Sequence, residues 1–166
     1  MVDDTEKHAI HSSIREEYVE YIFLGELCSF AWRTGRFVEI ARSNTDAFGY
    51  DIILTNSGIV RHVQLKATRE GGKTSFQKIN AALGNAPSGC VIWMYVDNPT
   101  LKPIRYGWFG GTPGQPLPPL GEIAAKHTKA NAEGVKAQRS GIRKVAKSRF
   151  DWLDGIEPVF DLLFKE

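Results

Sequence analysis

The alternation of apolar and polar residues between positions 50 and 68 is the clearest structural signal in the chain. Alternate positions from Ile59 to Ala67 are apolar apart from Arg61, whereas the other face carries Val60, His62, Gln64, Lys66 and Thr68. A period of two is typical of a strand with one face in the core and one polar face. The run 50–55 precedes it, joined by Asn56-Ser57-Gly58, residues that favour a tight turn. The pattern therefore predicts a β-hairpin.

Helical periodicity dominates the segment from Ser13 to about Gly35. Its start, Ser13-Ile14-Arg15-Glu16, has the spacing of a helix capping box, and apolar residues follow. Further elements are expected as strands near 36–42, 90–96 and 104–109 and a helix near 75–84. Strands that alternate with helices predict an α/β fold with a small mixed β-sheet flanked by helices.

Composition fits one domain over residues 1–166, of which 42% are hydrophobic and 24% charged. We expect a core over about 13–109, a Gly/Pro loop over about 110–121, and a basic segment with a C-terminal helix over about 122–166. The apolar run Ile156–Phe164 should dock on the body of the fold or line a homodimer interface.

Neither an apolar run of about 18 residues nor a signal-like segment is present, so we expect no membrane insertion and no secretion. The two cysteines, Cys28 and Cys90, form no CxxC pair and are expected to be buried thiols. This cysteine usage fits a reducing cytoplasm.

Candidate chemistry lies on the predicted hairpin, at Asp51, Gln64 and Lys66. Gln64 and Lys66 share a strand face, roughly 6 to 7 Å apart, and an acid on the neighbouring strand can meet both. Hard cations such as Mg²⁺ prefer oxygen ligands, which Asp51 and Gln64 supply. Lys66 could orient or deprotonate an attacking water. The alternative for Asp51 and Lys66 is a solvent-exposed ion pair without a catalytic role. His62 lies on the same strand face and could touch substrate, and its alternative is a solvated strand histidine.

A further acid, Glu26, falls on the apolar stripe of the first helix when the residues are placed at 100° intervals, whereas Glu16, Glu17 and Glu20 group on another flank. A buried carboxylate needs a cation or hydrogen-bond donors. Glu26 is therefore expected to reach Lys66 or a bound metal. Two alternatives stay open: Glu26 is solvated at the helix edge, or Glu20 takes its place.

The order of helix Glu26, then Gly49-Tyr50-Asp51, then Gln64-Leu65-Lys66 resembles the PD-(D/E)xK nuclease superfamily, over roughly residues 13 to 96. The resemblance implies a restriction-endonuclease-like three-layer core and a Mg²⁺-dependent endonuclease acting on DNA, with Mn²⁺ as a substitute metal. It implies catalytic roles for Glu26, Asp51, Gln64 and Lys66, and it implies that Glu26, Asp51, Gln64 and the Leu65 carbonyl hold the metal.

Two residues depart from the family pattern. Tyr50 stands where proline is usual, and Gln64 replaces the second acid, which removes one negative charge from the site. Gln-x-Lys versions occur in the family. The alternative function is a catalytically inactive module that keeps the fold and binds nucleic acid or a protein partner, and RNA as substrate is not excluded.

Charge is divided unevenly along the chain. Residues 1–60 carry a net charge of minus five and residues 122–150 a net charge of plus six. Phosphate neutralisation dominates nucleic-acid affinity, so this basic segment is expected to contact DNA. Its candidate contacts are Lys126, Lys129, Lys136, Arg139, Arg143, Lys144 and Lys147. The alternative is a solvated helical face.

Overall fold

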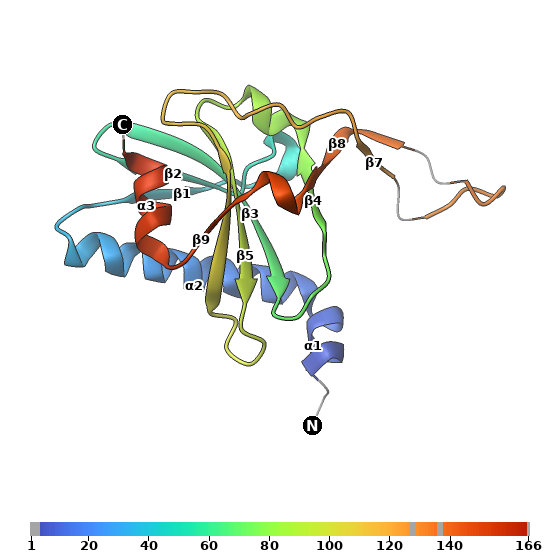
Figure 1. Cartoon of the computed structure of the whole chain (residues 1–166), viewed down its shortest axis with the longest axis horizontal. Coiled ribbons are helices and arrows are strands. Elements are labelled where there is room, and N and C mark those ends of the chain that lie inside the picture. Colours follow the sequence, from blue (N-terminus) through green and yellow to red (C-terminus); the bar gives the residue numbers. More distant parts are fainter. Residues whose placement is uncertain (1–3, 127–128, 136–137, 166) are drawn as a thin grey trace.

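The computed structural model describes residues 4–126, 129–135 and 138–165, which form a mixed α/β fold with two β-sheets (Figure 1). The helices are α1 (Asp4–Ile10), α2 (Ser12–Arg33) and α3 (Ile156–Phe164). The strands are β1 (Glu39–Arg42), β2 (Ile52–Asn56), β3 (Ile59–Arg69), β4 (Phe76–Asn80), β5 (Gly89–Val96), β6 (Pro103–Gly110), β7 (Ala124–Lys126), β8 (Gln138–Ala146) and β9 (Asp151–Leu153). Three short 3₁₀ turns are η1 (Asp46–Phe48), η2 (Ala81–Asn85) and η3 (Lys147–Arg149).

The larger sheet has the strand order β1-β2-β3-β5-β6-β9. Within the described residues of this sheet, β3 and β5 pair in parallel and the other neighbours pair antiparallel. The β2–β3 hairpin turns through Ser57 and Gly58, with φ of 49° and 83°, and Asn56 lies opposite Ile59. Positive φ at both central residues is the geometry that suits a two-residue hairpin turn. The predicted hairpin is therefore confirmed.

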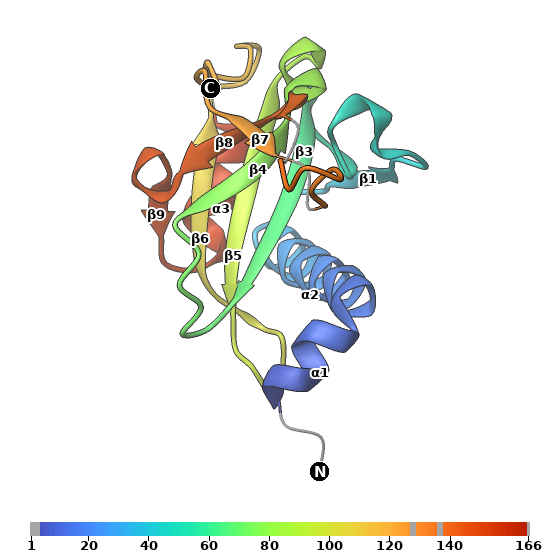
Figure 2. The same ribbon diagram turned by 90° about the vertical axis from the view of Figure 1, so that its right-hand side faces the viewer.

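Helices cover one face of this sheet and the smaller β4-β8-β7 sheet covers the other (Figure 2). The central strand β5 is buried on both sides, as its near-continuous apolar sequence requires. Ile92 and Met94 face the helices, whereas Val91 and Trp93 pack with Ile79 of the smaller sheet.

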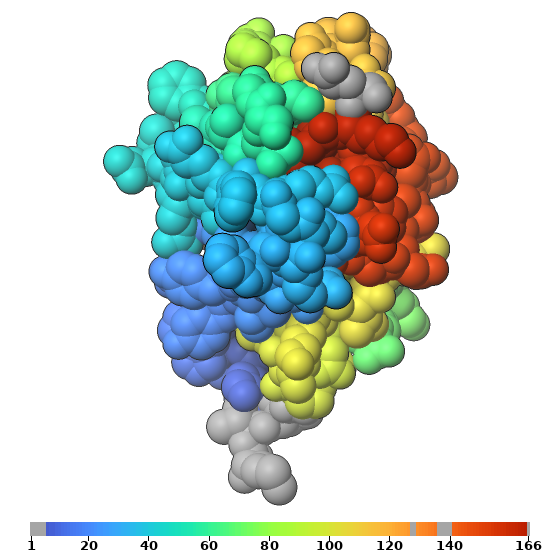
Figure 3. Space-filling view, turned by 90° about the vertical axis from the view of Figure 1, so that its left-hand side faces the viewer, coloured from blue at the N-terminus to red at the C-terminus, as the bar shows by residue number. Residues whose placement is uncertain are grey.

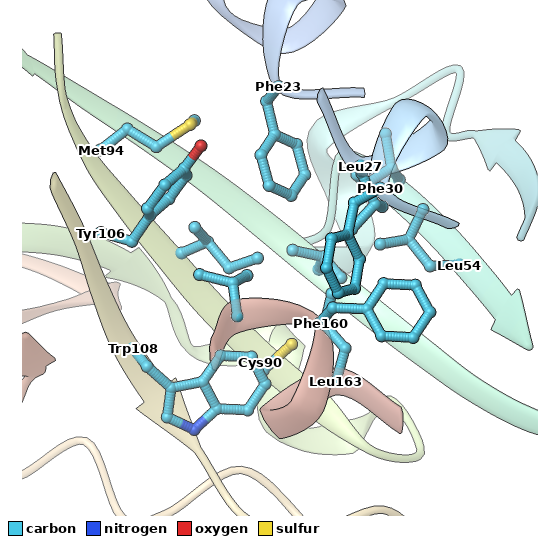
Figure 4. Packing of buried hydrophobic residues seen from close by; sticks show 14 of the residues in the cluster. Phe23, Leu27, Phe30, Leu54, Cys90, Met94, Tyr106, Trp108, Phe160 and Leu163 are labelled. Carbon is cyan, nitrogen blue, oxygen red and sulfur yellow. The ribbon is translucent and has the colours of Figure 1, made fainter. Parts of the chain in front are cut away.

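One turn after another, α2 buries Val19, Phe23, Leu27 and Phe30 against the sheet and α3 (Figure 4). The helix ends at Arg33 and is followed by Gly35 at φ 68°, as predicted. Its start differs: His11 makes no side-chain cap, because α1 precedes it and the backbone bonds continue through the junction. The C-terminal run docks as expected, with Phe160 of α3 contacting Phe30 at a ring-centroid distance of 5.2 Å.

Arg61 interrupts the apolar face of β3 because it holds the end of α3. Its guanidinium is fully buried and donates from Nε to Leu163 O at 2.8 Å and from Nη2 to Leu162 O at 2.7 Å. It also lies over the Trp108 ring, 5.2 Å from the centroid. A cation at a helix C-terminus satisfies otherwise unpaired carbonyls and complements the helix dipole.

Two predictions about elements were wrong in detail. Residues 75–84 form β4 and η2 rather than a helix, because β4 pairs with β8 from far along the chain. The strand predicted at 36–42 spans only Glu39–Arg42. The basic segment forms strands β7 and β8, so the alternative of a solvated helical face does not apply to it. Cys90 is buried as expected, but Cys28 is exposed. Among the described helices, none is long and apolar enough to cross a membrane.

Candidate active site

The hairpin residues singled out in the sequence border one cavity of about 770 Å³, at the edge of β3. Because β2 begins at Ile52, β3 has no partner on that side beyond Val63 among the described strands. Asp51 takes the partner's place: its N–H donates to Val63 O at 2.9 Å and its Oδ2 accepts from Leu65 N at 2.7 Å. Helix α2 and strand β4 form the facing walls.

Gln64 lines this cavity and has an unpaired side-chain oxygen. The side chain is only 9% exposed, and among the described residues its Oε1 has no hydrogen-bond partner. A buried carbonyl oxygen without a partner costs about 1 to 3 kcal/mol, so native structures rarely leave one unused. The Gln64 oxygen is therefore a candidate hydrogen-bond acceptor or metal ligand for a group bound in the cavity.

The backbone of Leu65 adds a second neutral oxygen. Its N–H points toward Asp51, and in an extended strand the N–H and C=O of one residue point to the same side. The Leu65 carbonyl therefore faces the strand edge that β2 leaves open. Asp51, Gln64 and Leu65 supply one anionic and two neutral oxygen donors.

Lys66 and Asp51 are both charged groups held largely out of water. Burial lowers the pKa of the Lys66 ammonium, and the negative charge of Asp51 opposes this shift. Burial raises the pKa of the Asp51 carboxyl, while the Leu65 N–H and Lys66 act in the opposite direction. Glu20 and Asp46 raise it further, which places both acids close to the site.

Glu26 does not reach the cavity. Its Oε2 accepts a hydrogen bond from the Tyr106 hydroxyl at 2.7 Å, on the flank of α2 that faces β6. The opposite flank supplies the acids of the cavity wall, Glu16, Glu17 and Glu20. Glu20 is the alternative that the helix periodicity left open, and it pairs with Arg42, whose Nε lies 2.7 Å from Glu20 Oε1.

The acids around the cavity are spread out. Within the described ranges, no three side chains of His, Cys, Asp or Glu lie close enough to hold a metal by themselves. Mg²⁺ does not need such a cluster, because it is commonly bound through one or two carboxylates, waters and substrate phosphates. The donor set of Asp51, Gln64 and the Leu65 carbonyl fits a metal bound in that manner.

Lys78 lies in the cavity wall and was missed in the sequence. It comes from β4, and its charge lowers the pKa of Lys66, so the two ammonium groups lie near each other. The sequence signal for this placement is the alternation of Phe76, Lys78 and Asn80, which indicates a strand and was not used because a helix was predicted there. His62, in contrast, lies outside the cavity lining: its ring contacts Tyr50 and its Nδ1 lies 2.6 Å from Pro87 O.

The basic residues lie mainly on the β7–β8 pair, whose residue Ile142 reaches the cavity wall. Lys126 and Lys129 are exposed. Lys144 lies over the Phe76 ring and Lys147 over the Tyr95 ring, at 4.6 and 4.7 Å from the centroids. Arg143 lies on β8, opposite Ile79 of β4. Lys136 and the side chain of Arg139 lie outside the described part of the chain.

No family model matches this chain, and comparisons with curated proteins and with solved structures give no significant match.

Proposed function

We propose that the chain is a Mg²⁺-dependent endonuclease with a restriction-endonuclease-like core that hydrolyses phosphodiester bonds in DNA. The observation that carries the proposal is the meeting of Asp51, Gln64 and Lys66 in one polar cavity at the open edge of β3. The three residues meet because the hairpin turn sets the register between β2 and β3. The arrangement agrees with the expectation from the PD-(D/E)xK resemblance.

The order of elements supports the same proposal. A long helix, α2, is followed by the antiparallel strands β1, β2 and β3 and then by β5, which runs parallel to β3. The mixed sheet lies between helices on one face and the small sheet on the other. Between β3 and β5 the chain has β4 and η2 where a helix was expected.

Asp51, Gln64 Oε1 and the Leu65 carbonyl would hold Mg²⁺, with Glu20 in place of Glu26 as the nearby helix acid. The bound cation would bind phosphate oxygens and acidify a water. Lys66 has a possible role in each of its protonation states. The charged ammonium offsets negative charge that develops on the phosphate. The lowered pKa favours the neutral amine, whose Nζ can accept a proton from the attacking water.

Nicking of supercoiled plasmid in Mg²⁺ or Mn²⁺ tests this function. Asp51→Asn keeps an oxygen for the Leu65 N–H but removes the charge, and Lys66→Met keeps the apolar stem. Each should slow nicking at least about a hundredfold. The matched controls Asp151→Asn and Lys102→Met change residues outside the cavity and should cut like wild type. Equal cutting by all five proteins would refute the proposal.

A second candidate function is a catalytically inactive nucleic-acid-binding module, supported by Gln64 in place of an acid and by the spread of acids around the cavity. Titration calorimetry with Mn²⁺ separates the two functions. Metal binding that disappears in Asp51→Asn supports the nuclease. Salt-sensitive DNA binding that is indifferent to metal supports the module.

A further inference from the structure

Strands β4 and β8 place two lysines directly opposite each other. Lys78 of β4 is the register partner of Lys144 of β8 in an antiparallel pair, and we refer to these two residues as the lysine pair. Residues that are directly opposite in such a pair share a face and have Cβ atoms roughly 5 Å apart. Like charges in this arrangement destabilise a sheet, so stability does not account for the lysine pair.

The lysine pair lies on the face of the small sheet that borders the candidate active site. On the other face, Ile79 and Val145 are fully buried in the core against β5. Phe76 and Lys78 alternate with the buried positions of β4, and both line the cavity. The Lys144 Nζ lies over the Phe76 ring, 4.6 Å from the centroid. Both ammonium groups are therefore at the cavity or beside it.

In the part of the chain that the structure describes, no acid forms an ion pair with the lysine pair. The ion pairs found there are made by arginines, and none involves Lys78 or Lys144. Lys78 lies instead near a third cation, Lys66, whose pKa it lowers. Three ammonium groups thus follow one another from β3 across β4 to β8. Such a row attracts an extended anion, and the phosphodiester backbone is one.

The acids of the cavity lie on its other walls. Its described lining includes five acids and two lysines, which give a net charge of minus three. Glu16, Glu17 and Glu20 come from α2 and Asp46 from η1, whereas the lining residues of β4 include no acid. A polyanion in the cavity is therefore repelled by the α2 wall and attracted to the β4 wall. This division leaves the side of α2 and Asp51 for the metal and the β4 side for the DNA backbone.

The lysine pair is specific to this cavity. A second cavity, of about 570 Å³, lies between the N-terminal helices and the turn from β5 to β6, segments that lie side by side in Figure 3. None of its described lining residues comes from β4 or β8. A ligand held by the lysine pair therefore also borders the candidate active site.

We propose that Lys78 and Lys144 bind phosphates that flank the scissile bond and so position the DNA strand in the candidate active site. The proposal rests on the proposed function, which supplies DNA as the ligand. Lys66 acts at the scissile phosphate, and the lysine pair holds the strand where it leaves the cavity toward β8. Phosphate contacts of this kind fix the register of a strand and read no sequence.

Fluorescence anisotropy of the full chain with a labelled DNA oligonucleotide in a metal chelator measures this binding without cleavage. Lys78→Met combined with Lys144→Met should weaken binding at least about tenfold at low salt. The same double variant should lower the magnitude of the slope of log K against log salt by about 0.9 for each lost contact. The matched control, Lys102→Met combined with Lys165→Met, removes the same charge at exposed positions and should stay within about threefold of wild type.

The single variant Lys78→Met separates a positioning role from a catalytic one in plasmid nicking with Mg²⁺. It should raise KM at least about tenfold and keep kcat within about threefold, because the lost contact binds the ground state and the transition state alike. Lys66→Met should lower kcat instead. Lys78→Arg keeps the positive charge and should restore KM to within about threefold of wild type. The thermal midpoint of Lys78→Met should not fall below that of wild type, since one of two opposed like charges is removed.

The outcomes separate this proposal from the proposed function. Nicking by wild type, with DNA binding and KM indifferent to the lysine pair, would overturn the proposal and leave the nuclease intact. DNA binding that depends on the lysine pair, in a wild type that does not nick, would refute the nuclease and support the lysine pair as a phosphate-binding site. Equal losses of affinity in the double variant and its control, a Lys78→Met effect confined to kcat, or a much lower thermal midpoint would also overturn the proposal.

Discussion

Asp51 and Lys66 are held in a setting that disfavours the charge on each. Burial raises the pKa of the Asp51 carboxyl and lowers that of the Lys66 ammonium, and their mutual attraction offsets this only in part. Residues placed at a stability cost are typical of functional sites, where chemistry rather than stability determines the side chain. Gln64 Oε1 is buried beside them and has no hydrogen-bond partner among the described residues.

Asp51→Asn should raise the free energy of unfolding at about pH 7, although the same change should slow the proposed metal-dependent nicking. Because the folded-state pKa lies above 3.8, the folded protein binds more protons than the unfolded chain between 3.8 and that raised value. Wild-type stability therefore falls as pH rises through this window, and the cost is fully present above it.

Urea unfolding of both proteins from about pH 4 to 7 measures the difference, which should shrink toward the acidic end. Asp151→Asn, at an exposed position, should show no such trend. A lower stability of Asp51→Asn at neutral pH would mean that the carboxylate is net stabilising in its place.

At the scale of elements, one buried cation from β3 is bonded to the end of α3, whose apolar face packs in the core. Arg61 joins the last carbonyls of α3 to the Gly111 carbonyl, which Nη2 contacts at 2.8 Å. It therefore links the C-terminal helix, the middle of the sheet and the start of the Gly/Pro loop.

Arg61→Met should lower the free energy of unfolding by about 2 to 4 kcal/mol, because it leaves one buried carbonyl, of Leu163, and two partly buried carbonyls, of Leu162 and Gly111, without this donor. Chemical denaturation measures the loss. Arg105→Met is the matched control: this arginine is exposed and lies over Trp152, so its replacement should cost less than about 1 kcal/mol. Similar losses in the two variants would contradict the assigned role of Arg61.

At the scale of the molecule, the fold places the basic segment beside the acidic one. Strand β8 pairs with β4, which forms a wall of the candidate active site, while α2 contributes the acidic wall. The β7–β8 hairpin extends outward from this position (Figure 1). A duplex held by the hairpin would lie next to the cavity.

Replacement of both Lys126 and Lys129 by Ala should weaken DNA binding and reduce the salt dependence of the binding constant. Each lost phosphate contact lowers the magnitude of the slope of log K against log salt by about 0.9. Fluorescence anisotropy over a salt series measures the slope. The double variant of Lys102 and Lys165, exposed lysines outside the hairpin, should keep the wild-type slope. An unchanged slope in both variants would remove the hairpin from the DNA interface.

Short-range patterns in the sequence were sufficient to predict the hairpin, the long helix and the proximity of Asp51 to Gln64 and Lys66. Each depends on side-chain periodicity or on a two-residue turn, which neighbouring residues determine. The candidate catalytic residues of the hairpin could therefore be identified from the 16 residues between Asp51 and Lys66, both included.

Other features depend on residues that are distant in the chain. Residues 76–80 form a strand because β8 pairs with them, the flank of α2 that lines the cavity is set by its packing on the sheet, and Arg61 is buried because α3 ends beside it. Hydrogen-bond partners and burial of this kind depend on the packing of the complete chain. Only the tertiary structure could therefore show that Glu20 rather than Glu26 lies at the candidate site, that Lys78 lines it and that a second cavity is present.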